Sequence, residues 1–350
     1  MLINYSFSNF RSFKNRTSLS MKAGRQRTFN ENLIRKNGLR IIPSVVIYGA
    51  NASGKSNIIM SLAVMREIIL SGGVNDNSPN LYNLEIYPFA HCKTNAPIEY
   101  EIEFIHKGHH IIYKLGILVK RFAKGDRKIL HEDLYVVTKP SHYIKIFERN
   151  LDGVKIMKNK KALKIMKFDE KLLKDFEKKI NENLDSTELF LTRAFKSTIN
   201  NELAEVVIDF FKEKLIVVSD FTLKKTNLIF SLKDQPKKDF FVWNKILDGF
   251  VKNADFGPQK IVFKSNKSEN EDSTDMELVS IYECEDKKII IPAELMESRG
   301  TLKLIDFAIP FERLFSAGGV FVLDEFDAAI HPEIIKGILS LFNNADINNN

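Results

Sequence analysis

The sequence predicts an α/β fold that joins a strand–loop–helix unit to an antiparallel β subdomain and a helical insertion. An apolar β-type run, 43–48, is followed by a glycine-containing loop and a helical pattern that extends to Leu70. Residues 85–149 alternate polar and apolar side chains with a period of two, which predicts about four antiparallel strands. Residues 151–215 are lysine-rich and have the apolar spacing of helices.

Length and composition indicate a folded protein of one large domain or two ordinary ones. The chain has 350 residues, 44% of them hydrophobic, which is sufficient for a full core. Its two cysteines, Cys92 and Cys284, lack metal-ligand spacing, which argues against a disulfide scaffold or a zinc site. No signal-peptide pattern or membrane-spanning apolar run is present. We therefore expect a soluble cytoplasmic protein without a membrane partner.

The N-terminal part predicts two strands, 2–8 and 17–21, separated by a short polar turn. Residues 23–40 are basic and polar and predict a loop. Residues 71–84, which follow the helical pattern that ends at Leu70, predict a turn-rich surface segment.

Residues 49–56, GANASGKS, fit the phosphate-loop pattern G-x-x-x-x-G-K-[ST] at every fixed position. Glycines let the backbone curl so that successive N–H groups face phosphate oxygens, and the following helix N-terminus adds partial positive charge. Lys55 is expected to bridge the β- and γ-phosphates of ATP, a catalytic as well as a binding role, and the Ser56 hydroxyl to ligate Mg²⁺. The alternative is a glycine turn before an ordinary helix, but chance matches occur in only about one in a hundred such chains. The expected nucleotide contacts are Gly49, Asn51, Ser53, Gly54, Lys55, Ser56 and Asn57.

Residues 319–327, GVFVLDEFD, predict a buried parallel strand that ends in two carboxylates. Ligands of open α/β sheets bind at this carboxyl edge. Asp324 suits the outer shell of Mg²⁺, and Glu325 suits a general base that orients and deprotonates the attacking water. Such a strand is weak evidence alone, but it is strong evidence in a chain that also has a phosphate loop.

Residues 297–301, ESRGT, precede an apolar helix, 302–315, that leads into the Asp-Glu strand. A small-residue turn that opens a helix makes a second anion-binding N-terminus, here with Ser298 and Gly300 as contacts. One chain does not need two phosphate cradles for one nucleotide, whereas two chains arranged head to tail do. The alternative is simple capping of the helix by Ser298; its place ahead of the Asp-Glu strand favours the functional interpretation.

Four blocks in this order resemble ABC-type ATPases of the SMC and overcoming-lysogenization-defect group, most of all bacterial abortive-infection ATPases described as AAA proteins. The blocks are NFRSF (9–13), GANASGKSN (49–57), ESRGT (297–301) and LDEFDAAIHP (323–332). The resemblance implies a P-loop NTPase of ABC-ATPase type. It also implies an ATP-dependent head-to-tail dimer that is often part of phage defence and works with a separate or fused nuclease effector.

The resemblance also assigns residues. It implies that Ser298 faces the γ-phosphate bound by the partner, that Arg11 reaches the nucleotide, and that Asp327 lies at the dimer seam. Two features depart from the family pattern. Families of this type continue into a strand with a switch histidine, which residues 345–350 do not supply, and His331 lies instead in a His-Pro turn. We therefore expect a C-terminally incomplete lobe or a chain that lacks normal hydrolysis. The glutamine that commonly follows the first lobe also has no match.

We expect a Mg²⁺-dependent ATPase, a dimer or higher oligomer, that gates a separate nuclease or toxin in abortive infection. Residues 1–150 would form the first ATPase lobe, 151–260 a helical insertion, and 261–350 the second lobe. One alternative is an SMC-like DNA-repair ATPase head, although 151–260 is too short and irregular for its coiled coil. Another is an ATP-sensing scaffold with little hydrolysis.

Three further segments leave alternatives open. Basic residues in 155–179 fit a DNA or RNA partner, although a solvated outer face is the favoured interpretation. The strand histidines His106, His109, His110 and His131 fit exposed or paired positions better than a metal site, because no helical or C-x₂-C ligand frame is present. Residues 243–250 predict a short helix and 264–276 a flexible polar loop.

Overall fold

The chain forms two compact units in the computed structural model. Unit 1 comprises Met1–Ser219, Gly319–Asp324 and Phe342–Asp346, and unit 2 comprises Asp220–Gly318, Glu325–Leu341 and Ile347–Asn350. These boundaries differ from the expected segments, because the lysine-rich helices and the Asp324 strand both pack within unit 1. The residues described are 1–25, 30–75, 86–89, 96–119, 127–140, 142–218, 241–242, 258–266, 275–284, 287–328, 330–344 and 347–348.

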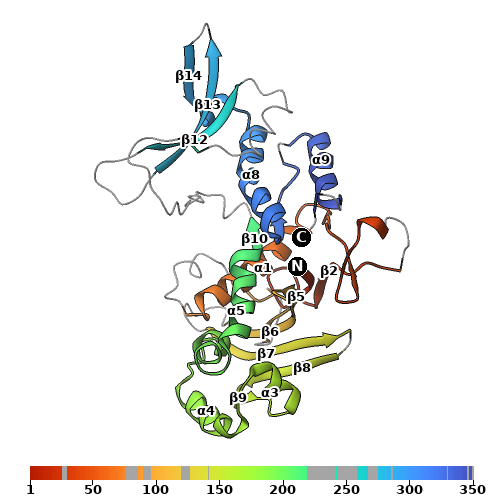
Figure 1. Ribbon diagram of the computed structural model, residues 1–350, viewed down its shortest axis with the longest axis vertical. Helices are drawn as coiled ribbons and strands as arrows, with labels where there is room; N and C mark the ends of the chain where they lie inside the picture. The colour runs from red at the N-terminus through yellow and green to blue at the C-terminus, as the bar shows by residue number, and fades with distance from the viewer. Residues whose placement is uncertain are drawn as a thin grey trace. The chain divides into compact units, whose positions relative to one another are not determined.

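A seven-stranded antiparallel sheet is the centre of unit 1, and its order is β2-β1-β5-β6-β7-β8-β9 (Figure 1). The predicted set of four antiparallel strands is confirmed, and three further strands extend the sheet at both edges. The strands are β1 (Leu2–Ser8), β2 (Thr17–Ser20), β5 (Ile98–His106), β6 (His109–Val119), β7 (Arg127–Lys139), β8 (His142–Asn150) and β9 (Gly153–Ile156).

Alternation along each strand gives the sheet one apolar and one polar face. On β5, Tyr100 and Phe104 are fully buried, whereas Glu101 between them forms ion pairs on the opposite face. The phosphate-loop helix α1 (Lys55–Ser71) packs into the same apolar core, and the Tyr5 hydroxyl donates to Ser61 Oγ at 2.9 Å. The helix therefore rests on the buried face of the sheet.

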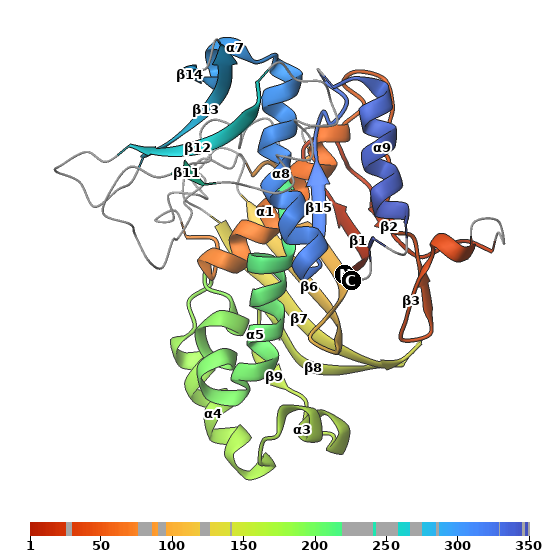
Figure 2. The ribbon, with the colours of Figure 1, turned by 45° about the horizontal axis from the view of Figure 1, so that its top comes forward.

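The lysine-rich segment is helical, as its apolar spacing predicts, and α4 packs on the edge strand β9 while α3 packs on β8 (Figure 2). Two stretches adopt the wider π-helical hydrogen bonding on either side of α5. The elements are α3 (Lys160–Met166), α4 (Glu170–Asn183), η2 (Leu191–Ile199), α5 (Asn201–Asp209) and η3 (Phe210–Lys214).

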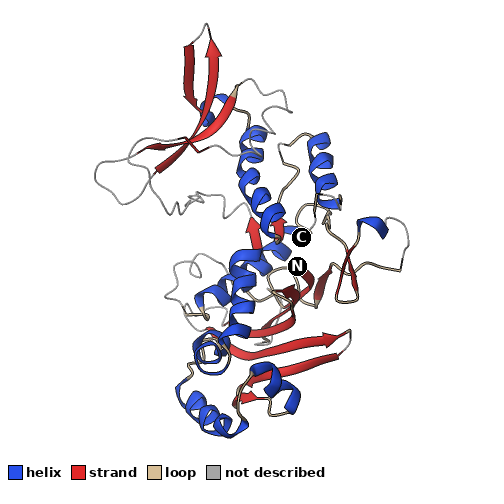
Figure 3. Cartoon of the chain, viewed as in Figure 1, coloured by secondary structure: helices blue, strands red, loops and turns tan. Residues whose placement is uncertain are grey.

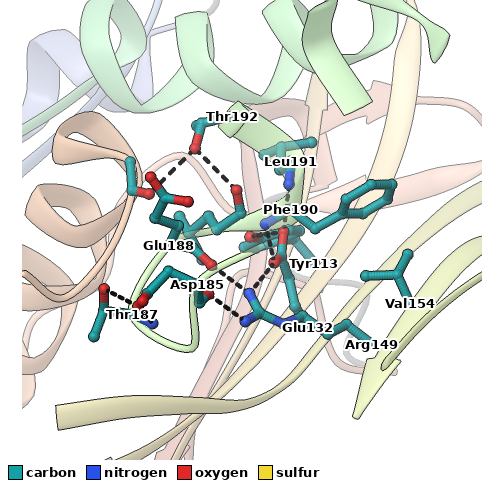
Figure 4. Close-up of polar contacts among 12 residues, drawn as sticks. Tyr113, Glu132, Arg149, Val154, Asp185, Thr187, Glu188, Phe190, Leu191 and Thr192 are labelled. Carbon is teal, nitrogen blue, oxygen red and sulfur yellow. Dashed lines mark hydrogen bonds and ion pairs between the residues drawn. The ribbon is translucent and has the colours of Figure 1, made fainter. Parts of the chain in front are cut away.

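A buried carboxylate joins the sheet to these helices. Glu132 on β7 is fully buried and accepts hydrogen bonds from the Tyr113 hydroxyl (2.9 Å) and the backbone N–H groups of Phe190 (2.7 Å) and Leu191 (2.9 Å) (Figure 4). Arg149 Nη1 lies 3.8 Å from Glu132 Oε2. Burial raises the pKa of Glu132, and the three donors and the guanidinium oppose that rise. The carboxylate thus ties the first two N–H groups at the start of η2, those of Phe190 and Leu191, to the sheet.

Residues 34–41 form a β-hairpin, so the predicted loop over 23–40 is wrong for this part. Strand β3 (Ile34–Lys36) pairs with β4 (Leu39–Ile41), and a short 3₁₀ turn, η1 (Asn30–Asn32), precedes them. Asn37 and Gly38 join the strands with φ of 51° and 75°. Asn-Gly is a residue pair that two-residue hairpin turns of this kind strongly favour, because both central residues need a positive φ.

The Asp-Glu strand, β15 (Val320–Leu323), pairs in parallel with β10 (Leu215–Val218), which confirms the predicted parallel strand. It is half-buried rather than buried, because β10 is its one neighbour among the described strands. The predicted strand 43–48 has no ladder partner in the described residues, and Val46 and Tyr48 are 65% and 90% exposed. Its β-type sequence thus forms no strand among the described residues, since a strand is stabilised by its ladder.

Unit 2 contains an antiparallel sheet, β11-β12-β13-β14, and the helix that follows the ESRGT turn (Figure 3). The strands of this sheet were not predicted: residues 264–266 and 275–276, expected in a loop, belong to β12 and β13, while 267–274 and the predicted helix 243–250 lie outside the described residues. The elements are β11 (Phe241–Val242), β12 (Lys260–Asn266), β13 (Asp275–Cys284), β14 (Lys287–Pro292), α7 (Ala293–Met296), α8 (Arg299–Ala317) and α9 (Pro332–Asn343), the last two residues of α9 belonging to unit 1. None of the helices described is long and apolar enough to cross a membrane.

Candidate nucleotide site

The loop between Gly49 and Lys55 is curled by two residues in the left-handed region. Ala52 has φ of 62° and Gly54 has φ of 95°, and the Ser53 N–H donates to the Ala50 carbonyl at 3.2 Å. This conformation turns successive N–H groups toward one side, as a phosphate cradle requires. Gly54 has to be a glycine, because its φ is positive and there is little space for a Cβ atom.

The NFRSF block packs directly behind this loop. A Cβ on Gly54 would lie 2.8 Å from Ser12 Oγ and 2.9 Å from Phe13 Cε2, which is closer than real side chains approach. The Asn57 side-chain amide donates to Ser12 Oγ at 2.8 Å. Two blocks about 40 residues apart in the sequence therefore form one structure, and Ser12 and Phe13 are supporting residues that the sequence did not single out.

Helix α1 begins at Lys55 with its N-terminus open. Gly54 is its N-cap and supplies no side-chain hydrogen bond, and the Ser56 hydroxyl is exposed. Lys55 Nζ donates to the carbonyls of Gly49 (2.9 Å) and Ala50 (3.0 Å), so the cation is held across the loop. Uncapped N–H groups beside a cation and a hydroxyl fit the phosphates and Mg²⁺ of a nucleotide. Asn51 and Ser53 are exposed on the same loop.

Arg11 lies in the NFRSF turn with φ of 47°. Its N–H donates to the Tyr87 carbonyl at 3.0 Å, and its Cζ atom is 5.6 Å from the centre of the Phe10 ring. A guanidinium over an aromatic face is stabilised in that position. Arg11 therefore shares a turn with Ser12, the residue that contacts the loop through Asn57.

Asp324 belongs to the same unit as the phosphate loop. Its N–H donates to the Val218 carbonyl at 3.0 Å, which extends the β10–β15 pairing to the first carboxylate of the Asp-Glu pair. Helix α1 contacts β10, and Arg66 Nε donates to the carbonyls of Phe211 (2.8 Å) and Leu215 (3.0 Å). Strand β10 thus connects the phosphate-loop helix to the strand that carries Asp324.

Glu325 opens the next segment of unit 2 and has φ of 48°. Non-glycine residues seldom adopt this conformation, and such strain is common at functional sites. The Glu325 carbonyl accepts hydrogen bonds from Lys303 Nζ on α8 and from the Ala328 N–H at 3.1 Å. Lys303 Nζ also donates to the Ala328 carbonyl at 3.1 Å. A lysine that the sequence did not single out therefore ties the Glu325 turn, which also contains Asp327, to α8.

The ESRGT turn is a capped helix start. Ser298 Oγ accepts the Thr301 N–H at 3.1 Å, so Ser298 is the N-cap of α8, and its side chain is exposed. The preceding Glu297 accepts the Ser280 hydroxyl at 2.7 Å and the Tyr282 hydroxyl at 3.0 Å, both from β13. Gly300 lies in the first turn of the helix. The hydroxyl pair was not predicted, since nothing in the sequence spacing relates β13 to this turn.

The strand histidines of the large sheet pair with carboxylates. His110 contacts Glu103 at 2.9 Å, and His131 contacts Glu99, which raises the pKa of this histidine through that hydrogen bond. Within the described ranges, no three His, Cys, Asp or Glu side chains gather as a metal site.

Comparison with known proteins gives one result about identity. No curated protein matches the chain. Residues 44–350, which include the phosphate loop, the ESRGT turn and the Asp-Glu strand, match the family profile described as "AAA domain, putative AbiEii toxin, Type IV TA system". This match supports a P-loop ATPase fold that binds ATP. Because it covers most of the chain, the protein belongs to this family of AAA domains.

Proposed function

We propose that this protein is a Mg²⁺-dependent ATPase that forms a head-to-tail dimer and gates an effector. The observation that carries the proposal is the open N-terminus of α1 behind a curled, cation-bearing loop, in the same unit as Asp324. Phosphates bind such a terminus because the first N–H groups of a helix have no acceptor one turn earlier, and at α1 no side chain caps them. Ser56 and Asp324 would hold Mg²⁺, which supplies charge neutralisation at the β- and γ-phosphates.

The chemical step would belong to Glu325. A carboxylate directly after the Asp324 strand is suited to take a proton from the attacking water. The left-handed backbone at Glu325, tied to α8 by Lys303, supports a specialised role, because such strain persists only where surrounding contacts maintain it.

The second phosphate contact would come from another copy of the chain. Ser298 and Gly300 form the start of α8, and the partner's nucleotide would meet them there. The exposed Ser298 side chain supports this contact. Trapped ATP would then hold two chains together, and hydrolysis would release them, which makes dimerisation the natural output of the ATPase cycle.

The effector would be a separate toxin or nuclease, and the setting would be phage defence by abortive infection in the cytoplasm. The family description, which names a toxin of a type IV toxin–antitoxin system, supports this setting. An SMC-like repair head and an ATP-sensing scaffold remain the alternatives. A scaffold would bind ATP without turnover, so a measured turnover number separates it from the proposed enzyme.

The experiment that tests the proposal is Glu325→Gln. Glutamine keeps the shape of the side chain but cannot take the proton, so ATP should persist and the protein should elute as a dimer with ATP and Mg²⁺. The dimer should dissociate when Mg²⁺ is chelated. Adding Ser298→Arg should abolish the dimer and leave ATP binding by the monomer intact. An ATP-dependent dimer that tolerates Ser298→Arg would contradict the head-to-tail arrangement, and full turnover by Glu325→Gln would contradict the catalytic role.

A further inference from the structure

Helix α3 presents a lysine face to solvent. Its N-cap Asn159 accepts the Ala162 N–H at 2.9 Å, and Ala162 and Met166 are buried against the core of unit 1. At about 100° per residue, three lysines fall within an arc of about 100° on the opposite side. These exposed side chains are Lys160, Lys161 and Lys164.

Two exposed lysines near the C-terminal end of α4, Lys178 and Lys179, add to this charge. Within the described part of the chain, none of these five lysines forms an ion pair. Their neighbours do: Lys158 contacts Glu177 and Lys167 contacts Glu202, each at 2.7 Å. The lysine face therefore has charge beyond what the local carboxylates neutralise.

Several lysines on the polar face of the large sheet do have carboxylate partners. There Lys22 contacts Glu103 (2.8 Å), Lys114 contacts Glu101 (2.9 Å) and Lys145 contacts Glu148 (2.7 Å). In the same unit, then, these three lysines have carboxylate partners, whereas Lys160, Lys161 and Lys164 on α3 have no ion pair among the described residues. An external anion would supply the partner that the α3 lysines lack among the described residues.

We propose that the exposed lysines of these two helices, Lys160, Lys161 and Lys164 on α3 together with Lys178 and Lys179 on α4, bind the phosphate backbone of double-stranded nucleic acid. The charge suits a polyanion and the side chains suit the phosphate backbone rather than the bases. A single-stranded partner would need exposed aromatic rings for stacking, but Phe168 and Phe176 pack against each other with ring centres 5.7 Å apart. A membrane surface would need apolar side chains among the lysines, and the α3 face has none in its arc.

The proposal predicts how the affinity for duplex DNA falls as the salt concentration rises. Five phosphate contacts on duplex DNA predict a slope of about −4.5 in a plot of log affinity against log salt. Affinity should then fall about 500-fold between 50 and 200 mM NaCl. Binding should not depend on DNA sequence or on ATP, since the lysines contact neither bases nor the phosphate loop.

The test is fluorescence anisotropy of a labelled 24-base-pair DNA duplex with the full chain and with K160A/K161A/K164A. Alanine preserves the helix, and the variant should bind at least tenfold more weakly at 50 mM NaCl, with a slope about 2.7 less steep. The matched control is K260A/K287A/K288A, which removes three exposed lysines from unit 2 and should bind within twofold of wild type. Thermal melting checks that both variants fold.

Each of these outcomes would overturn the proposal: no duplex binding by wild type, a flat salt dependence, unchanged binding by the α3 variant, or an equal loss in the control. Vesicles of phosphatidylserine and phosphatidylcholine test whether the protein binds a membrane surface instead. If they bind the protein and Leu151→Ser, an exposed position in the β8–β9 turn, abolishes that binding, the lysine face is a membrane surface and the proposal fails. An RNA duplex of the same length as competitor shows which nucleic acid is preferred.

Discussion

Helices α1 and α8 begin in different ways. Helix α1 starts after Gly54, which provides no side-chain cap, whereas α8 starts after Ser298, whose hydroxyl accepts the Thr301 N–H at 3.1 Å. The third N–H of each helix already has an acceptor, the Gly54 carbonyl for Asn57 (3.0 Å) and the Ser298 hydroxyl for Thr301, so the two starts differ in whether a side-chain oxygen occupies the terminus. The start of α1 can therefore accept a phosphate without displacing a side-chain cap. A phosphate at α8 would have to compete with the Thr301 N–H for the Ser298 hydroxyl.

Both starts are nonetheless held by a neighbour next to the cap. At α1, Ser12 contacts Asn57 and packs on Gly54. At α8, Glu297 accepts the hydroxyls of Ser280 and Tyr282. Each helix start is therefore held in place, and the difference is that a side-chain oxygen caps α8 and none caps α1.

The largest expected effect is that of Lys55→Ala on α1. The variant loses the cation that lies across the loop, and charge-assisted phosphate contacts are worth about 1.5–3 kcal/mol each. ATP affinity, measured by isothermal titration calorimetry, should fall at least tenfold while the melting of the ligand-free protein stays unchanged. Unaltered ATP affinity would remove the phosphate-loop assignment and, with it, the contrast between the two helices.

A smaller effect is expected from Gly54→Ala, which fills the close approach behind the loop. The added Cβ meets Ser12 Oγ at 2.8 Å and the strained φ of 95° remains, so we expect a loss of about 1–3 kcal/mol in unfolding free energy and weaker ATP binding. Gly108→Ala is the matched control, because Gly108 has φ of 78° with nothing within 4 Å of its Cβ position. Equal losses of stability in the two variants would show that Ser12 and Phe13 do not restrict the loop.

Much of the fold was predictable where local pattern and packing agree. Period-two alternation gave the strands of the large sheet, because one face is buried and the other is charged. The phosphate loop and α1 were predictable because their glycine and lysine positions are set by backbone geometry. The hairpin at Asn37-Gly38 was also predictable from its turn residues, although it was missed.

The remaining parts depended on contacts distant in sequence. Residues 43–48 have β-type composition, but the described strands provide no ladder beside them, so Val46 and Tyr48 are exposed. The hydroxyls that hold Glu297 come from a strand 15 and 17 residues earlier. Lys303 approaches the Glu325 carbonyl across 22 residues. Composition and spacing carry no information about such pairs, because they are created by the packing of separate elements.

The smallest effect on stability is expected at Ser298. Variants of this residue also separate the two interpretations of the start of α8. Ser298→Ala removes the cap and should cost about 1 kcal/mol of unfolding free energy. Ser298→Asp keeps the cap and places a negative charge at a helix N-terminus, so stability should be equal to or slightly above that of wild type. In the Glu325→Gln background, however, that carboxylate would face the partner's phosphate.

If Ser298 contacts the partner's nucleotide, Ser298→Asp should therefore abolish the ATP-dependent dimer without any loss of stability, because like charges repel where a phosphate must enter. Ser298→Ala should show the reverse pattern, a modest loss of stability with a dimer weakened by about tenfold or less, since one neutral hydrogen bond contributes about 0.5–1.5 kcal/mol. Sedimentation velocity with ATP and Mg²⁺ measures the dimer, and thermal melting without nucleotide measures the cap. A Ser298→Asp protein that dimerises like its Glu325→Gln parent would mean that Ser298 only caps α8, and that the open terminus of α1 is the one phosphate site on each chain.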